Sequence, residues 1–179
     1  MKFSEYSKIA ESTQLEQSKS LDYLALGLCG EISEFLQADS KNFKYEAGDI
    51  IWYLDRYADA IETNLEEVIY PHPTKMFPKG ARKFCSKAPI QQRRPDPFHT
   101  TKESLFYSAG ELAEITKKHI RDGVLKKSQA KKCLFQIYIN LVSLLIEFNV
   151  TIEEVAELNL EKLSSRKSRG VIQGSGDNR

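Results

Sequence analysis

Four carboxylates in the first third of the chain are spaced as they would be on two facing helices. Glu31 and Glu34 form one pair, Glu46 and Asp49 form another, and the members of each pair are three positions apart. On a helix, such residues project from the same face. Carboxylates brought together repel one another unless a cation lies between them, and oxygen-rich clusters suit Mg²⁺ or Mn²⁺. These residues therefore predict a metal site.

Apolar residues recur at three- and four-residue steps around both acid pairs, which predicts helices. The stripe through the first pair comprises Leu21, Leu24, Leu28, Ile32 and Phe35. The stripe after the second pair comprises Ile50, Ile51, Leu54, Tyr57, Ala58 and Ile61. Further helices are expected at 105–119, 134–148 and 152–163, with hairpin turns at 41–43 and 122–123. We therefore expect an all-α protein.

The composition suits one domain with a packed core and argues against several classes of protein. The chain has 179 residues, of which 41% are hydrophobic, and this is enough for a core. No apolar run approaches the 18 residues of a membrane span, and residues 1–5 lack the apolar stretch of a signal peptide. Cys29, Cys85 and Cys133 show no zinc-binding spacing, which favours free thiols in a reducing cytosol. We expect a cytoplasmic protein with no membrane contact.

The net charge of +1 conceals an acidic part and a basic part. Residues 1–70 hold 6 Lys and Arg against 14 Asp and Glu, whereas residues 71–179 hold 20 against 11. Such a division would suit a metal–polyphosphate complex, and a solvated basic surface is the alternative. All six prolines lie between Pro71 and Pro97, so 71–100 is expected to be a basic linker or a loop packed on the bundle. Contact with nucleic acid is the weaker interpretation of this segment.

The two sides of this segment resemble each other. Residues 30–34 match residues 110–114 at an offset of 80, and the expected helix starts at Asn64 and Thr151 match at an offset of 87. A duplicated helical hairpin is the simplest account. Two hairpins packed together make a four-helix bundle with site residues projecting inward. We therefore expect a four-helix-bundle-like pseudo-dimer of two hairpins, with flanking helices, within one chain.

The two copies differ in the acids that they keep. The second copy retains its first pair, as Glu111 and Glu114, but has Cys133 and Gln136 where the first copy has its second pair. Only the first copy can therefore assemble four carboxylates.

The second copy is the richer in cations. Lys162 and Arg166 are four positions apart and project from one helix face, and Lys117 follows the retained acids. One copy is thus expected to supply the metal side and the other much of the cationic side. The expected organisation is one compact domain with a first hairpin at 1–70, the linker at 71–100, a degenerate second hairpin at 101–166 and a basic, Gly-containing tail at 167–179.

At these residues the chain resembles the MazG-like, all-α nucleoside triphosphate pyrophosphohydrolases, a superfamily that includes the dimeric dUTPases. The family motif is Glu-Glu-x-x-Glu, a spacer and Glu-x-x-Asp. Here residues 30–34 read Gly-Glu-Ile-Ser-Glu and residues 46–49 read Glu-Ala-Gly-Asp, so that Gly30 replaces the leading Glu. The surroundings at 24–28 and 48–54 also match the family, and 159–163 with Arg166 and the tail 169–179 look like bacterial and phage members.

The resemblance implies a reaction and roles for the site residues. The reaction is Mg²⁺-dependent hydrolysis of a nucleoside triphosphate between the α- and β-phosphates, giving monophosphate and pyrophosphate, with Mn²⁺ able to substitute. The implied roles are metal binding by Glu31, Glu34, Glu46 and Asp49, phosphate binding by Lys162 and Arg166, and a place near the sugar or phosphates for Asn159.

The chemistry needs a base for the attacking water and contacts for the nucleotide. A carboxylate not fully used for coordination can take the proton of the water, and Glu34 is our choice because a first-helix acid can face the water from across the metal. Lys117 is added as a substrate-binding cation. Trp52, Tyr53 and Phe35 are candidates to flank the base, although aromatic residues at helical spacing are more often part of the core.

Two other functions stay open at this stage. One is a non-catalytic nucleotide-binding or regulatory protein descended from an enzyme, and the other is a helical protein that binds nucleic acid through 71–100. The histidines are not in a Glu-x-x-His arrangement, which argues against a di-iron site. Among substrates we favour a purine deoxynucleotide such as dGTP. Because single-repeat relatives build the bundle by dimerisation, we expect a homo-oligomer, a dimer of pseudo-dimers.

Overall fold

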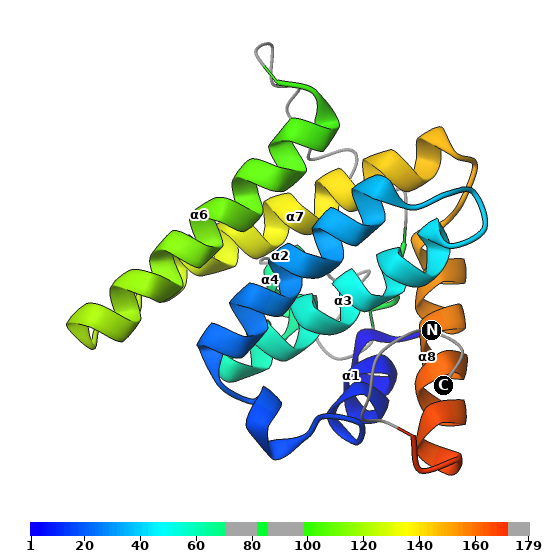
Figure 1. Cartoon of the computed structure of the whole chain (residues 1–179), viewed down its shortest axis with the longest axis horizontal. Helices are drawn as coiled ribbons and strands as arrows, with labels where there is room; N and C mark the ends of the chain where they lie inside the picture. The colour runs from blue at the N-terminus through cyan, green and yellow to red at the C-terminus, as the bar shows by residue number, and fades with distance from the viewer. Residues whose placement is uncertain (71–81, 86–98, 172–179) are drawn as a thin grey trace.

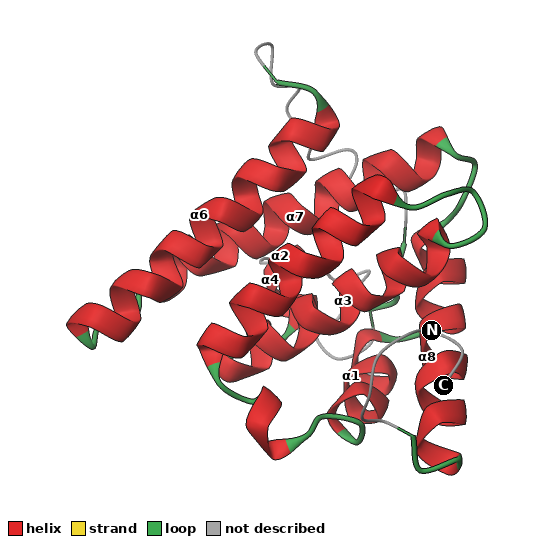
Figure 2. Ribbon diagram, viewed as in Figure 1, coloured by secondary structure: helices red, strands yellow, loops and turns green. Residues whose placement is uncertain are grey.

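The computed structural model describes residues 1–70, 82–85 and 99–171. Within these ranges the regular structure is helical, apart from one isolated antiparallel bridge between Lys2 and Lys83 (Figure 2). The all-α prediction is therefore confirmed. Most of the predicted linker and the end of the predicted tail lie outside the described residues.

Within each half of the chain, short connections join the helices (Figure 1). The first half of the chain forms α1 (Phe3–Glu11), the 3₁₀ turn η1 (Glu16–Ser18), α2 (Leu21–Gln37), α3 (Phe43–Ala60) and α4 (Leu65–Ile69). The second half forms α6 (Thr101–Asp122), α7 (Lys127–Glu147) and α8 (Ile152–Ser168). Both predicted hairpin turns are present, and Gly123 closes α6 with a φ of +72°, a conformation that glycine adopts without a Cβ clash.

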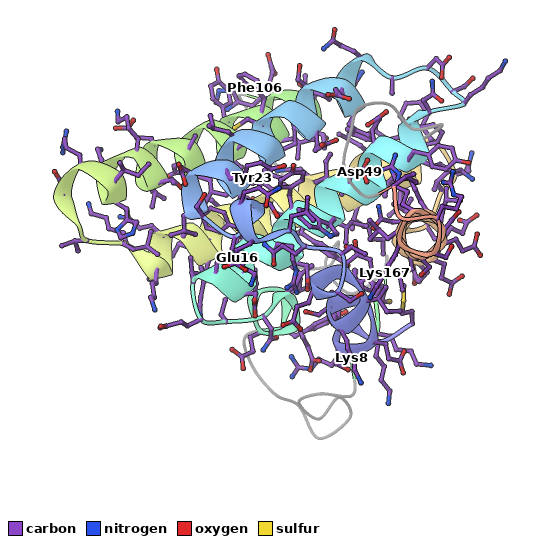
Figure 3. The ribbon with its side chains drawn as sticks, turned by 60° about the horizontal axis from the view of Figure 1, so that its bottom comes forward. Lys8, Glu16, Tyr23, Asp49, Phe106 and Lys167 are labelled. Atoms are coloured by element: carbon purple, nitrogen blue, oxygen red, sulfur yellow. The ribbon has the colours of Figure 1, made fainter. Side chains whose placement is uncertain are left out.

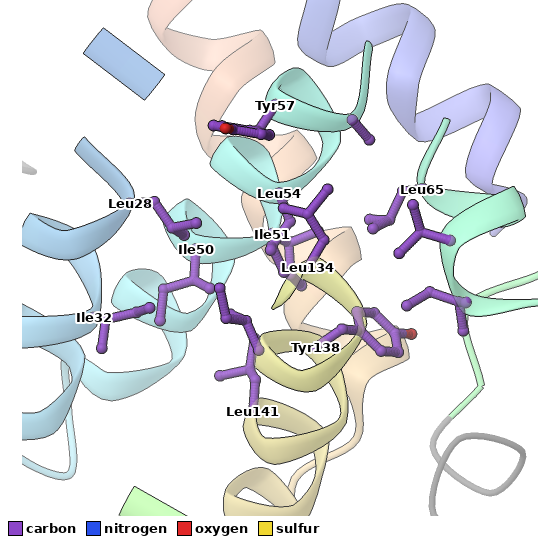
Figure 4. Packing of buried hydrophobic residues seen from close by; sticks show 14 of the residues in the cluster. Leu28, Ile32, Ile50, Ile51, Leu54, Tyr57, Leu65, Leu134, Tyr138 and Leu141 are labelled. Atoms are coloured by element: carbon purple, nitrogen blue, oxygen red, sulfur yellow. The ribbon is translucent and has the colours of Figure 1, made fainter. Parts of the chain in front are cut away.

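The bundle consists of the two predicted hairpins packed side by side. Helix α2 packs against α3 and α6, and α7 packs against α6 and α3. The apolar stripes face inward, so burial of their side chains is the main stabilising force of the bundle. Figure 4 shows part of this core, with labelled residues Leu28, Ile32, Ile50, Ile51, Leu54, Tyr57, Leu65, Leu134, Tyr138 and Leu141.

The contacts between the two hairpins follow the pattern of the predicted repeat. The Cys29 thiol on α2 lies 3.8 Å from the Ala109 carbonyl oxygen on α6, and these residues are 80 positions apart, which is the offset of the first repeat match. Helices α2 and α6 therefore meet at equivalent positions. Helix α8 packs on α3 and, reciprocally, α4 packs on α7. Each copy thus sends its following helix onto the other copy.

The two exchanged helices begin alike and end differently. The side chains of Asn64 and Thr151 each accept a hydrogen bond from the backbone N–H three residues on, so both predicted caps are confirmed. Helix α4 stops after five residues, whereas α8 continues for seventeen. Only α8 is therefore long enough to carry its cations along the neighbouring hairpin.

Helix α1 closes one side of the bundle and lies against both α3 and α8 (Figure 1). Its Phe3 ring packs 4.1 Å from the ring of Phe84. The buried Arg56 of α3 donates to the Ser7 hydroxyl of α1 at 2.7 Å. These contacts fix α1 beside the helices that carry the candidate site.

Among the described residues, no single helix has the length and apolarity to cross a membrane; only α7 and α8 taken together do, and they are bent by 103° to each other.

Candidate metal centre and anion groove

Three of the four predicted acids converge between α2 and α3. Glu31 of α2 and Glu46 and Asp49 of α3 each place a carboxylate oxygen within 4.8 Å of the others. Glu46 is buried, and the other two are partly exposed. Glu34 lies one turn farther along α2, is exposed, and falls outside this three-acid cluster. The cluster offers hard oxygen donors at a spacing that suits a small divalent cation.

The electrostatics of the cluster favour a positive charge. Burial, and then the negative charges of Asp49, Glu34 and Glu46, raise the pKa of Glu31 from its usual value of 4.5 to about 8, against a lowering by Lys162. Without a cation, the cluster therefore retains a proton at neutral pH.

A pH-dependent stability follows from this shift. Between about pH 5 and pH 8, folded Glu31 keeps a proton that the unfolded chain has lost, so the metal-free protein is expected to lose stability as pH rises. Each pKa unit corresponds to at most about 1.4 kcal/mol, and side-chain relaxation reduces this amount. We therefore expect the free energy of unfolding to fall by about 2 kcal/mol over this pH interval. Glu31→Gln should flatten this dependence. Urea unfolding in a chelator at pH 5.5 and 8 measures it, and an unchanged slope in the variant would contradict the assignment.

Helix α8 completes the site from the other copy. The Lys162 ammonium lies 2.5 Å from one Asp49 oxygen, and the Asn159 amide donates to the other at 3.0 Å. Asp49 and α8 lie together in Figure 3. Lys162 is only 7% exposed, so its ammonium neutralises Asp49 away from bulk solvent. The predicted partnership of Lys162 with the acids is thus formed within one chain.

Gly48 allows α8 to approach α3 this closely. A Cβ at this position would lie 2.8 Å from the Asn159 Cβ and 2.9 Å from its amide nitrogen. A Cβ at Gly30, by contrast, would meet nothing within 4 Å.

We expect Gly48→Ala to move α8 away from Asp49. Overpacking of this kind costs about 1–3 kcal/mol, and the altered position of Asn159 should also weaken cation binding. The matched change Gly30→Ala should stabilise the protein by about 0.5–1 kcal/mol, because alanine is the better helix former. Thermal unfolding of both variants tests the close approach, and two equal shifts would contradict it.

A cationic groove adjoins the acids along α8. Its volume is about 570 Å³, and its lining residues are Asn42, Tyr45, Leu158, Glu161, Lys162, Ser165, Arg166 and Arg169. Lys162 belongs both to this groove and to the ion pair with Asp49, so the groove begins where the acid cluster ends. Arg166 is buried in its wall, as expected of a guanidinium held for a specific contact. The groove can therefore accept an anion beside a bound cation.

Trp52 and Tyr53, two of the aromatic residues predicted to flank the base, make different contacts in the structure. The Trp52 indole donates to the Thr13 hydroxyl at 3.2 Å. The Tyr53 ring lies over Gly27 and stacks on the exposed Tyr23, with centroids 6.4 Å apart. Tyr53 is close enough to the acids for Glu31 and Asp49 to raise its pKa, although burial is the main cause. Trp52 and Tyr53 thus remain candidates for contact with a base.

Two other predicted positions lie elsewhere. Phe35 is buried in the core and lines a small pocket with Phe43 and Phe148 at the end of α2. Lys117 forms an ion pair with Glu114 on the exposed surface of α6. The structure does not bring either residue to the three-acid cluster.

The equivalent position in the second copy has lost the cluster. The Cys133 thiol hydrogen-bonds to Glu111, which together with burial, the main cause, raises the pKa of the thiol to about 12. Glu111 and Cys133 stand at the positions that the repeat alignment pairs with Glu31 and Glu46, and they too are in contact. Gln136, the counterpart of Asp49, is exposed. The described residues contain no second acid cluster of this kind.

Sequence reasoning missed two residues of the site. Tyr6 on α1 donates a hydrogen bond to Asn159, and Gly48 makes room for that amide. Phe3, Tyr6 and Ala10 are spaced as a helical apolar stripe, and this signal could have revealed α1. No local pattern, however, indicates that α1 reaches α8.

Together, these features define a class of all-α protein in which a duplicated hairpin carries one composite acid site. In sequence, 76 residues are 42% identical to the Gene 37 protein of Mycobacterium phage L5, covering 40% of this chain and 67% of the phage protein. The chain belongs to the same family as this phage protein, whose name states no activity. No protein-family model matches the chain, and no solved structure matches it.

Proposed function

We propose that the protein is a divalent-cation-dependent hydrolase that cleaves a nucleoside triphosphate between the α- and β-phosphates. The observation that carries the proposal is the junction at Asp49, where a three-acid cluster from one copy meets a cationic groove from the other. A metal–polyphosphate complex needs these two surfaces side by side. The motif resemblance supplies the reaction class.

The acid cluster fits Mg²⁺ or Mn²⁺ in the chemistry of its donors. Three carboxylate oxygens lie within 4.8 Å of one another, and carboxylate oxygens are the hard donors that these cations prefer. When bound, such a cation supplies charge neutralisation for the phosphate oxygens and lowers the pKa of a bound water. Glu31, Glu46 and Asp49 are the residues that would hold it.

The remaining residues have roles that follow from their positions. Lys162 and Arg166 bind the phosphates, with the Arg166 guanidinium able to contact two oxygens. Because Lys162 lies at the junction, it orients the phosphate nearest the acids. Glu34 is our proposed general base, since its carboxylate is exposed, lies outside the three-acid cluster and is near enough to Glu31 to influence it.

The nucleoside is proposed to lie toward the exposed Tyr23 and its stacked neighbour Tyr53. Tyr23 is labelled in Figure 3, its ring stacks on that of Tyr53, and the Tyr53 ring lies against Gly27 of α2. Aromatic rings bind nucleobases by stacking, which favours the larger purines. A purine deoxynucleotide such as dGTP is therefore the first substrate to test.

The direct test is hydrolysis of all eight common nucleoside triphosphates with Mg²⁺ and with Mn²⁺. We expect equal amounts of monophosphate and pyrophosphate, and no turnover in a chelator. Release of orthophosphate and diphosphate would contradict α–β cleavage. Tight binding of nucleotides without turnover of any of them would favour the non-catalytic alternative.

A further inference from the structure

We propose that Tyr6 of α1 is a positioning residue, which orients the carboxylate of Asp49 for cation binding through the side chain of Asn159. The inference rests on the proposed cation site and adds a residue that does not touch the cation but holds a residue that contacts one of its ligands. Tyr6 precedes the acid motifs by more than twenty residues and lies on α1, outside the two helices, α2 and α3, that carry the acids.

The contacts form a continuous chain from α1 to the acid cluster. The Tyr6 hydroxyl donates to the Asn159 amide oxygen at 2.7 Å. The amide nitrogen of Asn159 in turn donates to Asp49 Oδ1 at 3.0 Å. Tyr6 and Asn159 are 0% and 1% exposed, so water does not compete with the bond between them, whereas the bond to Asp49 is partly buried. Three helices thus contribute one residue each to a relay that runs from the buried Tyr6 and Asn159 to the partly exposed Asp49.

The relay also fixes the direction of the amide. An asparagine side chain has a donating and an accepting end, which would exchange if it turned over. The Asp49 carboxylate only accepts hydrogen bonds, so the donating end of the amide must face it, and the accepting end then receives the hydrogen bond from the Tyr6 hydroxyl. Burial, and then the charges of Asp55 and Asp49, raise the pKa of Tyr6 well above its usual value, which keeps the donated proton in place.

The position of Tyr6 is itself secured by its surroundings. Its ring packs edge-on to Phe84 at 5.3 Å, and the next residue, Ser7, accepts a hydrogen bond from the buried Arg56. On the other side, Gly48 lets Asn159 lie against α3. The hydroxyl therefore meets the amide at a fixed distance, which is what orientation of a ligand requires. Outer partners of this kind typically contribute a factor of about 10–100 to metal affinity.

The test is a titration of wild type and Tyr6→Phe with Mn²⁺, in which electron paramagnetic resonance measures the free and bound Mn²⁺ and hence the affinity. We expect affinity to fall about ten-fold, by the outer-partner range, because the ring stays and only the hydroxyl is lost. The matched control is Tyr57→Phe, another buried tyrosine, whose hydroxyl meets Thr116 at 2.7 Å on α6. This control loses a comparable hydrogen bond and should keep wild-type affinity, which separates orientation of Asp49 from general loss of packing.

A double variant tests the route through Asn159. If Tyr6 acts through this amide, Tyr6→Phe should have no further effect on Mn²⁺ affinity once Asn159→Ala is present. Equal affinities of wild type and Tyr6→Phe, or additive losses in the double variant, would overturn the inference alone. Absence of Mn²⁺ binding by the wild type would instead overturn the cation site, and this inference with it.

Discussion

Asp49→Asn is expected to abolish cation binding and nucleotide hydrolysis while leaving the fold in place. Asp49 is the residue at which the three-acid cluster, the Asn159 amide and the Lys162 ammonium meet. The amide keeps the shape of the side chain but removes its charge and one oxygen. Since loss of an outer partner already costs about 10–100-fold, loss of a ligand should cost at least about 100-fold in Mn²⁺ affinity and in turnover.

The second copy provides the matched control for this change. Glu111 is the counterpart of Glu31 in the other repeat, but its neighbour is Cys133 rather than an acid. Glu111→Gln should therefore leave Mn²⁺ affinity and hydrolysis at wild-type levels. Circular dichroism and thermal unfolding of both variants confirm that folded proteins are compared. Equal losses of affinity in the two variants would contradict the assignment of one functional cluster per chain.

Arg56→Met is expected to cause the largest loss of stability. The guanidinium is 1% exposed and contacts the buried Asp55 at 2.5 Å and the Ser7 hydroxyl at 2.7 Å. Burial raises the pKa of Asp55, and Arg56 lowers it, so removal of Arg56 leaves a buried carboxyl without its counter-charge. Breaking a buried pair in this way costs about 3–5 kcal/mol, and the Tm should fall by about 10 °C.

Arg121→Met is the control for this prediction. Arg121 also pairs with its sequence neighbour, Asp122, at 2.6 Å, but the pair is exposed at the end of α6. Surface ion pairs contribute little, so this change should shift the free energy of unfolding by no more than about 0.5 kcal/mol. Urea unfolding of both variants measures the difference. Similar losses in the free energy of unfolding for the two variants would show that burial does not account for the contribution of the Arg56–Asp55 pair to stability.

Much of the bundle can be predicted from the sequence because its signals are local. Helix stripes, the caps at Asn64 and Thr151 and the turn at Gly123 depend on residues within a few positions of one another. The acid pairs share a helix face by spacing alone, and duplication makes the second hairpin follow from the first. Glu31 meets the acids of α3 as soon as α2 and α3 pack together as a hairpin.

The parts that could not be predicted depend on contacts distant in sequence. The relay from Tyr6 to Asn159 spans 153 positions, and its geometry depends on how α1 docks. Glu34 shares a helix face with Glu31, yet one further turn places it at the exposed edge of the cluster. Lys117 follows a retained acid pair, but its helix carries it onto the outer surface of α6. Sequence spacing determines which face of a helix a residue occupies, whereas tertiary packing determines which other residues that face contacts.

Duplication within one chain explains why the two copies can differ. In a symmetric homodimer, every substitution appears at both sites, so loss of one acid pair would remove both clusters. Here the second copy has Cys133 beside Glu111, while its final helix supplies Lys162 and Arg166 to the first copy. The composite site therefore requires both repeats, although the acid cluster comes from one of them.

The central claim is that the acids of the first repeat bind a divalent cation beside the α8 groove. Its most direct test is anomalous X-ray scattering from crystals grown with Mn²⁺ and an α,β-methylene nucleoside triphosphate, which resists cleavage. The account predicts manganese density bounded by Glu31, Glu46 and Asp49, with the phosphates beside Lys162 and Arg166 and no manganese beside Glu111 and Cys133. Manganese density only at another location, or nucleotide bound away from the groove, would contradict it.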